Sequence, residues 1–179
     1  PVAQAAIMTL GREQHFRVDT TEDVRYFTED SLRHYSAVIF LHTTGELLER
    51  PAQVDFQRFI QAGGGFVGIH AAADAEYGWR WYGRLVGGYF DGHPPIQPAK
   101  LVVTDGRHRM TRHLPAIWER TDEWYNFKRL ATDLEVLLSI DETSYRGGTN
   151  GIRHPMTWFH QFDGGRAWYT ALGHTDESY

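Results

Sequence analysis

A short apolar run that ends in a histidine constrains this chain more than any other feature of its sequence. Residues 63–69 read Gly-Gly-Gly-Phe-Val-Gly-Ile, and His70 and three alanines follow. The glycines end the element before the run, and the run itself has the length and apolar character of a buried strand. The pattern therefore predicts a strand that delivers a titratable side chain to the edge of a sheet.

Two other apolar runs end in the same way. Residues 37–41 stop at His42, and residues 167–173 stop at His174. In an open parallel sheet, ligands bind in the crevice beyond the carboxyl ends of the strands. We therefore expect these two histidines and His70 to meet at one crevice. The alternative is that each histidine caps its own strand or a helix and that the three share no site.

Length and composition limit the classes to which the chain can belong. Its 179 residues suit one domain. A net charge of −5 without a run of basic residues argues against nucleic acid and anionic membranes as partners. The absence of cysteine excludes disulfides and thiolate chemistry, but it suits the cytoplasm, the periplasm and secretion alike. Since no apolar stretch approaches the ~20 residues that span a bilayer and no signal peptide is visible, we expect a soluble protein.

The spacing of apolar residues predicts an α/β fold. Between the runs 37–41 and 65–69, apolar side chains recur at helical spacing after Pro51, at Ala52, Phe56, Phe59 and Ile60. Strand, helix and strand in this order form a βαβ unit with two parallel strands. The run 37–41 is almost continuously apolar, so we expect that strand to be buried on both faces.

The second half of the chain has the strand pattern of an antiparallel addition to this sheet. A turn at 163–165 joins the last two strand-like segments as a hairpin. The strand-like segments are 100–104, 117–121, 135–140, 156–162 and 166–169. We also expect a helix at 3–10, a strand at 15–19 and an irregular, functional loop at 87–95.

Aromatic residues make up 14% of the chain, and many lie beside polar residues. Stacking rings next to hydrogen-bonding groups suit sugars, which have apolar faces and hydroxylated edges. Trp79, Trp81, Trp124 and Tyr125 are therefore candidates for a carbohydrate cleft. The alternative is that the tryptophans pack in the core.

Carboxylates follow two of the strand-like segments and could act with the histidines. Glu123 comes just after residues 117–121, and Asp176 comes two residues after His174. A histidine paired with an acid can act as a general acid or base. Thr43 is the nearest hydroxyl, so activated water suits the site better than a covalent nucleophile. Two or three histidines with Glu123 could also hold zinc with one position open for water, although no H-E-x-x-H motif supports this possible cofactor.

Five segments of the chain form a specific combination. They are Phe40-Leu41-His42-Thr43-Thr44-Gly45, Gly64 to Asp74, Thr121-Asp122-Glu123-Trp124-Tyr125, His154 to Trp158, and Gly173-His174-Thr175. Together they resemble the ThuA-like family, which is linked to trehalose utilisation, and the resemblance spans nearly the whole chain.

This resemblance implies a flavodoxin-like three-layer sandwich of the class I glutamine amidotransferase type, with a mostly parallel central sheet and antiparallel additions. The elbow that carries the nucleophilic cysteine in an amidotransferase corresponds here to residues 68–72, with His70 in place of the cysteine. Thiol-based glutamine hydrolysis is therefore excluded. His174 and Asp176 have the spacing of the histidine and acid in those relatives. Family members begin with a strand and continue with a helix after the Gly-His-Thr segment, so we expect residues 1–179 to be a single domain truncated at both ends.

The function that follows from both lines of reasoning is a sugar-active enzyme of undefined reaction, acting in the utilisation of trehalose, a related disaccharide or a keto-sugar. The expected partner is a small-molecule carbohydrate, with further domains of a longer protein and a homo-oligomer as open possibilities. The alternative is a non-catalytic carbohydrate-binding or interaction module on an enzyme-like fold. The predicted catalytic residues are His70, His174, Glu123 and Asp176, and the predicted substrate-binding residues are His42, Thr43, Trp79, Trp81, His93, Trp124 and Tyr125.

Overall fold

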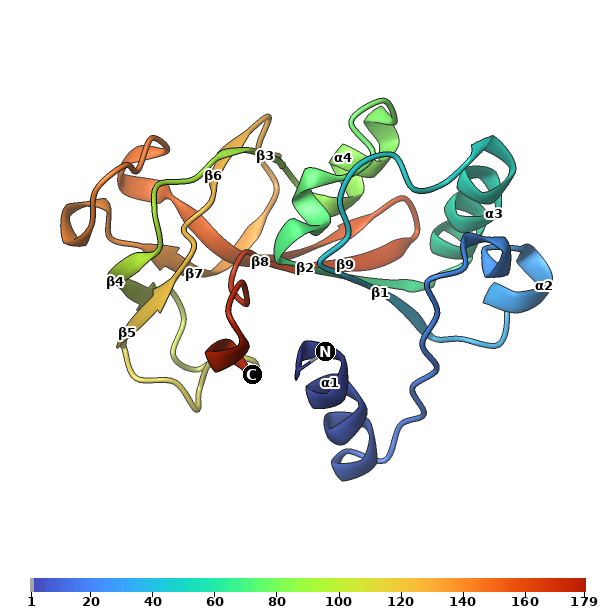
Figure 1. Ribbon diagram of the computed structural model, residues 1–179, viewed down its shortest axis with the longest axis horizontal. Helices are drawn as coiled ribbons and strands as arrows, with labels where there is room; N and C mark the ends of the chain where they lie inside the picture. Colours follow the sequence, from blue (N-terminus) through green and yellow to red (C-terminus); the bar gives the residue numbers. More distant parts are fainter. Residues whose placement is uncertain (1) are drawn as a thin grey trace.

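Three parallel strands form the part of the sheet that carries the histidines. The computed structural model describes residues 2–179 and contains a seven-stranded sheet in the order β1-β2-β9-β8-β7-β4-β5 (Figure 1). β1 (Ala37–Leu41), β2 (Gly65–Ile69) and β9 (Gly165–Thr170) run parallel to one another. α3 (Arg50–Gln61) connects β1 to β2. The predicted βαβ unit is therefore confirmed.

The remaining four strands extend the sheet in antiparallel fashion. They are β8 (Pro155–Phe162), β7 (Glu135–Ile140), β4 (Gln97–Val103) and β5 (Ile117–Asp122). β8 and β9 form the predicted hairpin, in which Phe162 pairs with Gly165. The structure thus confirms an α/β fold in which antiparallel strands are added to a parallel part.

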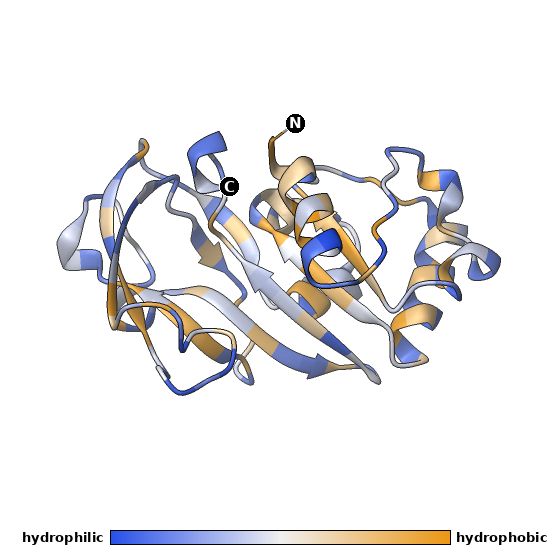
Figure 2. Ribbon diagram, turned by 90° about the horizontal axis from the view of Figure 1, so that it is seen from below, coloured by the Kyte–Doolittle hydropathy of each residue, from blue (hydrophilic) through white to orange (hydrophobic). Residues whose placement is uncertain are grey.

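Helices lie on both sides of this sheet. α3 and α4 (Arg80–Val86) lie on one side, whereas α1 (Val2–Glu13) and the C-terminal segment lie on the other (Figure 1). Seen from below, α1 lies in front of the sheet (Figure 2). α2 (Glu29–Leu32) packs against α3. The short 3₁₀ helices are Val24–Tyr26, His70–Asp74, Glu142–Ser144, Gly151–Arg153 and Asp176–Ser178.

Among residues 2–179, no helix has the length and apolar character needed to cross a membrane.

Aromatic rings fill the space between the parallel strands and the helices α3 and α4. Phe40 of β1 stacks on Phe56 of α3, with ring centroids 5.5 Å apart, and meets Phe66 of β2 edge to face at 5.5 Å. Tyr82 of α4 stacks on Phe40 at 5.6 Å, and its hydroxyl donates to the carbonyl of Ala72. This packing fixes β2, and hence His70 at its end, against two helices.

Three of the expected elements differ from the structure. β1 is buried only at Phe40, and Ile39 remains 37% exposed, because β1 has a strand on one side only and no helix covers its second face completely. Residues 15–19 form no strand, since they run from the end of α1 without a strand to pair with. The expected loop at 87–95 contains β3 (Tyr89–Gly92), which pairs with β6 (Asn126–Lys128) in a separate two-stranded ribbon.

The alternation of buried and exposed residues on β1 gives a direct test of where the core lies. Phe40→Ala should lower the free energy of unfolding by about 3–5 kcal/mol, because it removes a buried ring from the aromatic cluster. Ile39→Ala, on the other face of the same strand, should cost at most about 1 kcal/mol. Chemical denaturation of both variants measures the difference, and equal losses would contradict this placement of the core.

Candidate functional site

His70 lies at the carboxyl end of β2, where the chain turns sharply into a 3₁₀ helix. Its φ is 52°, in the left-handed region that a non-glycine residue seldom adopts, and its side chain is almost completely buried. The Nδ1–H donates to the carbonyl oxygen of Ala171 over 2.7 Å, and the Tyr169 hydroxyl donates to the carbonyl of His70. Because Nδ1 carries the hydrogen in the neutral ring, Nε2 presents its lone pair to the site.

Three side chains converge at this point, and we refer to them as the His-Glu-His cluster: His70, Glu123 and His174. The Nε2 atom of His70 lies 3.2 Å from Oε2 of Glu123 and 3.1 Å from Nδ1 of His174. The third distance, from Nδ1 of His174 to Oε2 of Glu123, is 3.3 Å. The expected meeting of His70, His174 and Glu123 is therefore present in the structure, at the carboxyl ends of β2 and β9.

A buried carboxylate that the sequence analysis did not assign to the site brings these elements together. Asp122 is completely buried and accepts hydrogen bonds from the backbone N–H groups of Gly173 (2.8 Å) and His174 (3.1 Å). It also accepts from the N–H of Glu123 at 2.9 Å and from the Ser178 hydroxyl at 3.3 Å. Bonds to an ionised acceptor are stronger than those between neutral groups. Asp122 therefore fixes the end of β5 against the turn after β9.

Asp176, which was expected to pair with His174, does not approach it. Its side chain is exposed on the C-terminal 3₁₀ helix. The amidotransferase-like spacing of histidine and acid is thus present in the sequence, whereas in the structure the imidazole of His174 faces Glu123. In the 3₁₀ helix that contains Asp176, it is Ser178 that faces the site, where its hydroxyl donates to Asp122.

Three further candidates surround the His-Glu-His cluster. Tyr125 lies against the His70 ring with centroids 4.2 Å apart, and Nε2 of His93 lies 3.3 Å from Oε1 of Glu123. The ring centroid of His42 is 5.5 Å from that of His70, and its Nε2 is 2.9 Å from the Tyr179 hydroxyl. Like His70, His42 has a left-handed φ, of 54°. The structure thus brings all three strand-end histidines together beyond the carboxyl ends of the parallel strands.

The tryptophans expected to line a carbohydrate cleft lie in the core instead. Trp124 is fully buried, and its Nε1–H donates to the carbonyl of Gln97 over 2.7 Å. Trp79 and Trp81 are 7% and 8% exposed and stack on each other beside Phe56. Thr43, also expected to bind substrate, is half-buried in the turn after His42.

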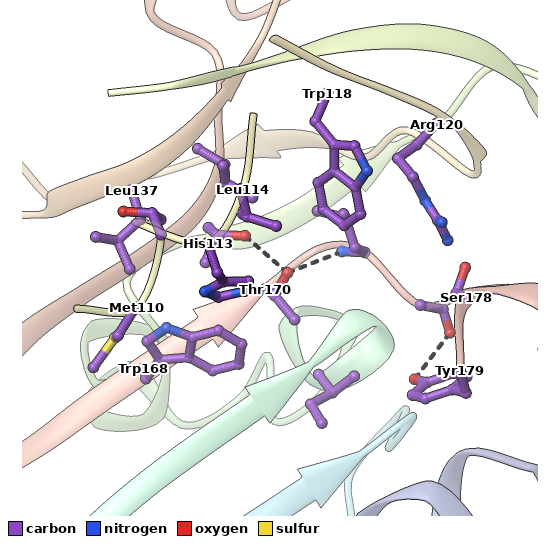
Figure 3. Close-up of a pocket in the computed structure, with 16 residues that line it drawn as sticks. Met110, His113, Leu114, Trp118, Arg120, Leu137, Trp168, Thr170, Ser178 and Tyr179 are labelled. Atoms are coloured by element: carbon purple, nitrogen blue, oxygen red, sulfur yellow. Dashed lines mark hydrogen bonds between the residues drawn. The ribbon is translucent and has the colours of Figure 1, made fainter. Parts of the chain in front are cut away.

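A cavity of about 330 Å³ lies on one face of the sheet, and Figure 3 shows the residues that line it. Ile69 and Gly173, which precede His70 and His174 in the chain, are among them, so the cavity is a neighbour of the cluster. Its walls are mainly apolar and include Trp118 and Trp168, while Gly173 and Tyr179 form its border toward the cluster. None of the three cluster residues lines it. The convergence of acid and base groups and this cavity are therefore neighbouring but separate features.

Burial of the His70 side chain determines whether this histidine carries a charge. It lowers the pKa of His70, although the Ala171 carbonyl and the negative charge of Glu123 act in the opposite direction. Burial also lowers the pKa of His42 and raises that of the adjoining Tyr179 to about 12. At neutral pH His70 is therefore an uncharged base, and Tyr179 remains a hydroxyl donor.

Two imidazoles and a carboxylate in mutual contact can transfer protons or bind a cation. His174 is the accessible member, since 40% of its side chain is exposed against 3% for His70 and 10% for Glu123. Its Nδ1 faces Glu123, which leaves Nε2 free for another partner. This is the arrangement in which a carboxylate orients a histidine and stabilises its charged form.

Comparisons with known proteins agree with this fold. A family model described as ThuA, trehalose utilisation, matches residues 1–179. A protein from Bacteroides uniformis described as ThuA-like is 28% identical, with a TM-score of 0.83, over 99% of this chain and 76% of that one. A similarly described protein from Parabacteroides merdae is 20% identical, with a TM-score of 0.77, over 96% and 75% of the two chains. A cytoplasmic protein of Salmonella typhimurium is 15% identical, with a TM-score of 0.70, over 94% and 75%. No curated protein matches significantly.

Asp122 and Asp176 form a matched pair for testing which carboxylate fixes the backbone around His174. Asp122→Asn should lower the free energy of unfolding by about 1–3 kcal/mol, because an NH₂ group would face a buried backbone N–H. Asp176→Asn changes an exposed side chain and should stay within about 0.5 kcal/mol of the unchanged protein. Urea denaturation measures both, and an unaffected Asp122→Asn variant would contradict the structural role given to Asp122.

The lowered pKa of His70 predicts a loss of stability on acidification. Below pH ~6.5, the unfolded chain takes up a proton at this residue that the folded chain resists, so the free energy of unfolding should fall between about pH 7 and 5. His70→Asn should reduce this slope, by at most about 1.4 kcal/mol per pH unit. Denaturation of chelator-treated protein at several pH values provides the measurement. His34→Asn, at an exposed position, serves as control; identical slopes in all three proteins would refute the prediction.

Proposed function

The chain belongs to the ThuA family, trehalose utilisation, and from this we propose that it acts on a carbohydrate by general acid-base chemistry at the His-Glu-His cluster. The substrate class is trehalose, a related disaccharide or a keto-sugar derived from one. The observation that carries the proposal is the mutual contact of His70, Glu123 and His174 at 3.1–3.3 Å. Proton transfer by such positioned groups contributes about 10²–10⁴-fold to a reaction rate.

His174 is the residue proposed to exchange a proton with the sugar. Its ring is the most exposed of the cluster, and Nε2 is free because Nδ1 contacts Glu123. When His174 accepts a proton from a sugar hydroxyl or from a water, the adjacent carboxylate stabilises the imidazolium that forms. His70 supports this step as a neutral, tautomerically fixed neighbour, held by the Ala171 carbonyl.

The groups around the cluster suit a polar, hydroxylated substrate. His93 has 39% of its side chain exposed and contacts the second oxygen of Glu123. The His42 ring lies next to that of His70, with Tyr179 as its hydrogen-bond partner. These groups can donate to or accept from sugar hydroxyls, and Tyr125 adds an aromatic ring beside them.

Turnover of a panel of disaccharides and their keto derivatives tests the proposal. His174→Ala should lower kcat by at least about 100-fold while the protein remains folded, because it removes the accessible proton-transfer group. His34→Ala changes an exposed histidine in another part of the fold and should keep full activity. Unchanged turnover in His174→Ala would refute the role of the cluster, and sugar binding without any turnover by the unchanged protein would favour a binding module.

A further inference from the structure

The His-Glu-His cluster presents three metal-ligating atoms to a single point. We infer that His70 Nε2, Glu123 Oε2 and His174 Nδ1 bind one divalent transition-metal ion, of which zinc fits best, and leave one coordination position open. These atoms come from three elements that are far apart in the sequence, so the site has no local sequence motif. Within residues 2–179, no other trio of histidine, aspartate or glutamate side chains is arranged in this way.

The distances between the three atoms match those between ligands of one ion. Bonds of about 2.0–2.1 Å to zinc place two ligands of a tetrahedral site about 3.3 Å apart, and the same bonds in an octahedron place them about 2.9 Å apart. The observed separations are 3.1, 3.2 and 3.3 Å. Two of the three lie closer to the tetrahedral value and the third lies midway. Two imidazoles with one carboxylate form a zinc ligand set that keeps a position for water or substrate.

The tautomer of His70 also favours a cation at this point. Its Nδ1–H is committed to the Ala171 carbonyl at 2.7 Å, so the Nε2 lone pair points toward the Glu123 carboxylate. Two acceptor atoms 3.2 Å apart repel each other unless a proton or a cation lies between them. A hydrogen on His174 Nδ1 can serve this purpose, and a metal ion that replaces it would bind all three lone pairs at once.

Neighbouring groups hold the proposed ligands in orientation, as outer contacts do in established metal sites. The Ala171 carbonyl fixes the His70 ring, and Asp122 fixes the backbone of His174 through its N–H. His93 Nε2 contacts the other oxygen of Glu123, which leaves Oε2 for the ion. Each ligand therefore has its own support, and the site requires little rearrangement to bind.

A bound ion would polarise a sugar oxygen or a water at the open position. With Nδ1 on the ion, His174 would carry its hydrogen on Nε2 and donate to the substrate, so in the metal-bound form the ion would take over the activation that His174 provides as a base without metal. In this role toward the substrate the inference rests on the proposed function, whereas binding of the ion itself does not. A test that measures binding alone therefore separates the two proposals.

The test is titration of the chelator-treated chain with ZnCl₂ by calorimetry, together with the visible absorption of the Co²⁺ form. We expect one equivalent of Zn²⁺ to bind, and a Co²⁺ spectrum of low coordination number. Glu123→Gln and His174→Ala should each weaken binding by at least tenfold. Glu123→Gln keeps the shape of the side chain, and His174 is exposed enough for its alanine variant to fold, which circular dichroism verifies. His34→Ala should bind as the unchanged protein does.

Lack of stoichiometric Zn²⁺ binding by the unchanged protein would overturn the inference, and so would equal affinity in Glu123→Gln, His174→Ala and His34→Ala. The latter result would assign binding to surface histidines. Tight binding with full sugar turnover by the metal-free protein would keep the metal site and remove its role in catalysis. Turnover that depends on His174 without metal binding would keep the proposed function and overturn the metal site.

Discussion

The buried carboxylate of Asp122 is the interaction on which the site depends. β5 is at one end of the sheet, and β2 and β9 lie toward the other, so nothing in the strand pairing itself brings Glu123 to His70. The bonds from Asp122 to the N–H groups of Gly173 and His174 close this gap. A buried anion is unfavourable unless donors surround it, and here four donors do so. The geometry of the cluster is thus a consequence of satisfying one buried charge.

Three features of the structure fix the charge, the tautomer and the position of His70. Burial keeps it neutral, the Ala171 carbonyl selects its tautomer, and its Nε2 faces Glu123 and His174 from a left-handed backbone at the end of β2. The rigid aromatic packing around Phe66 holds this strand against two helices. A side chain that is fixed in advance loses little entropy when it binds a partner, so the packing of the core also orders the site.

Sequence reasoning located the histidines because their positions follow from strand periodicity. Apolar runs of strand length ended at His42, His70 and His174, and parallel strands end at the same edge. It assigned Asp176 rather than Asp122 because spacing along the chain says nothing about contacts between elements 50 residues apart. The tryptophans were harder to place, since an indole beside polar residues suits a cleft and a core equally. In the structure, Trp124 donates to a backbone carbonyl inside the core, which satisfies its one polar atom without solvent.

The left-handed backbone at His42 and His70 lowers the stability of the fold at two positions that carry candidate site residues. A non-glycine residue in this conformation costs about 1–3 kcal/mol, and glycine would adopt it without strain. At His70 the loss of a buried ring and of its bond to the Ala171 carbonyl would offset this gain, whereas His42 is exposed and glycine there would mainly relieve strain. Selection for heat resistance alone would therefore tend to remove the ring of His42 beside His70, so thermal selection of this domain needs an activity screen alongside it.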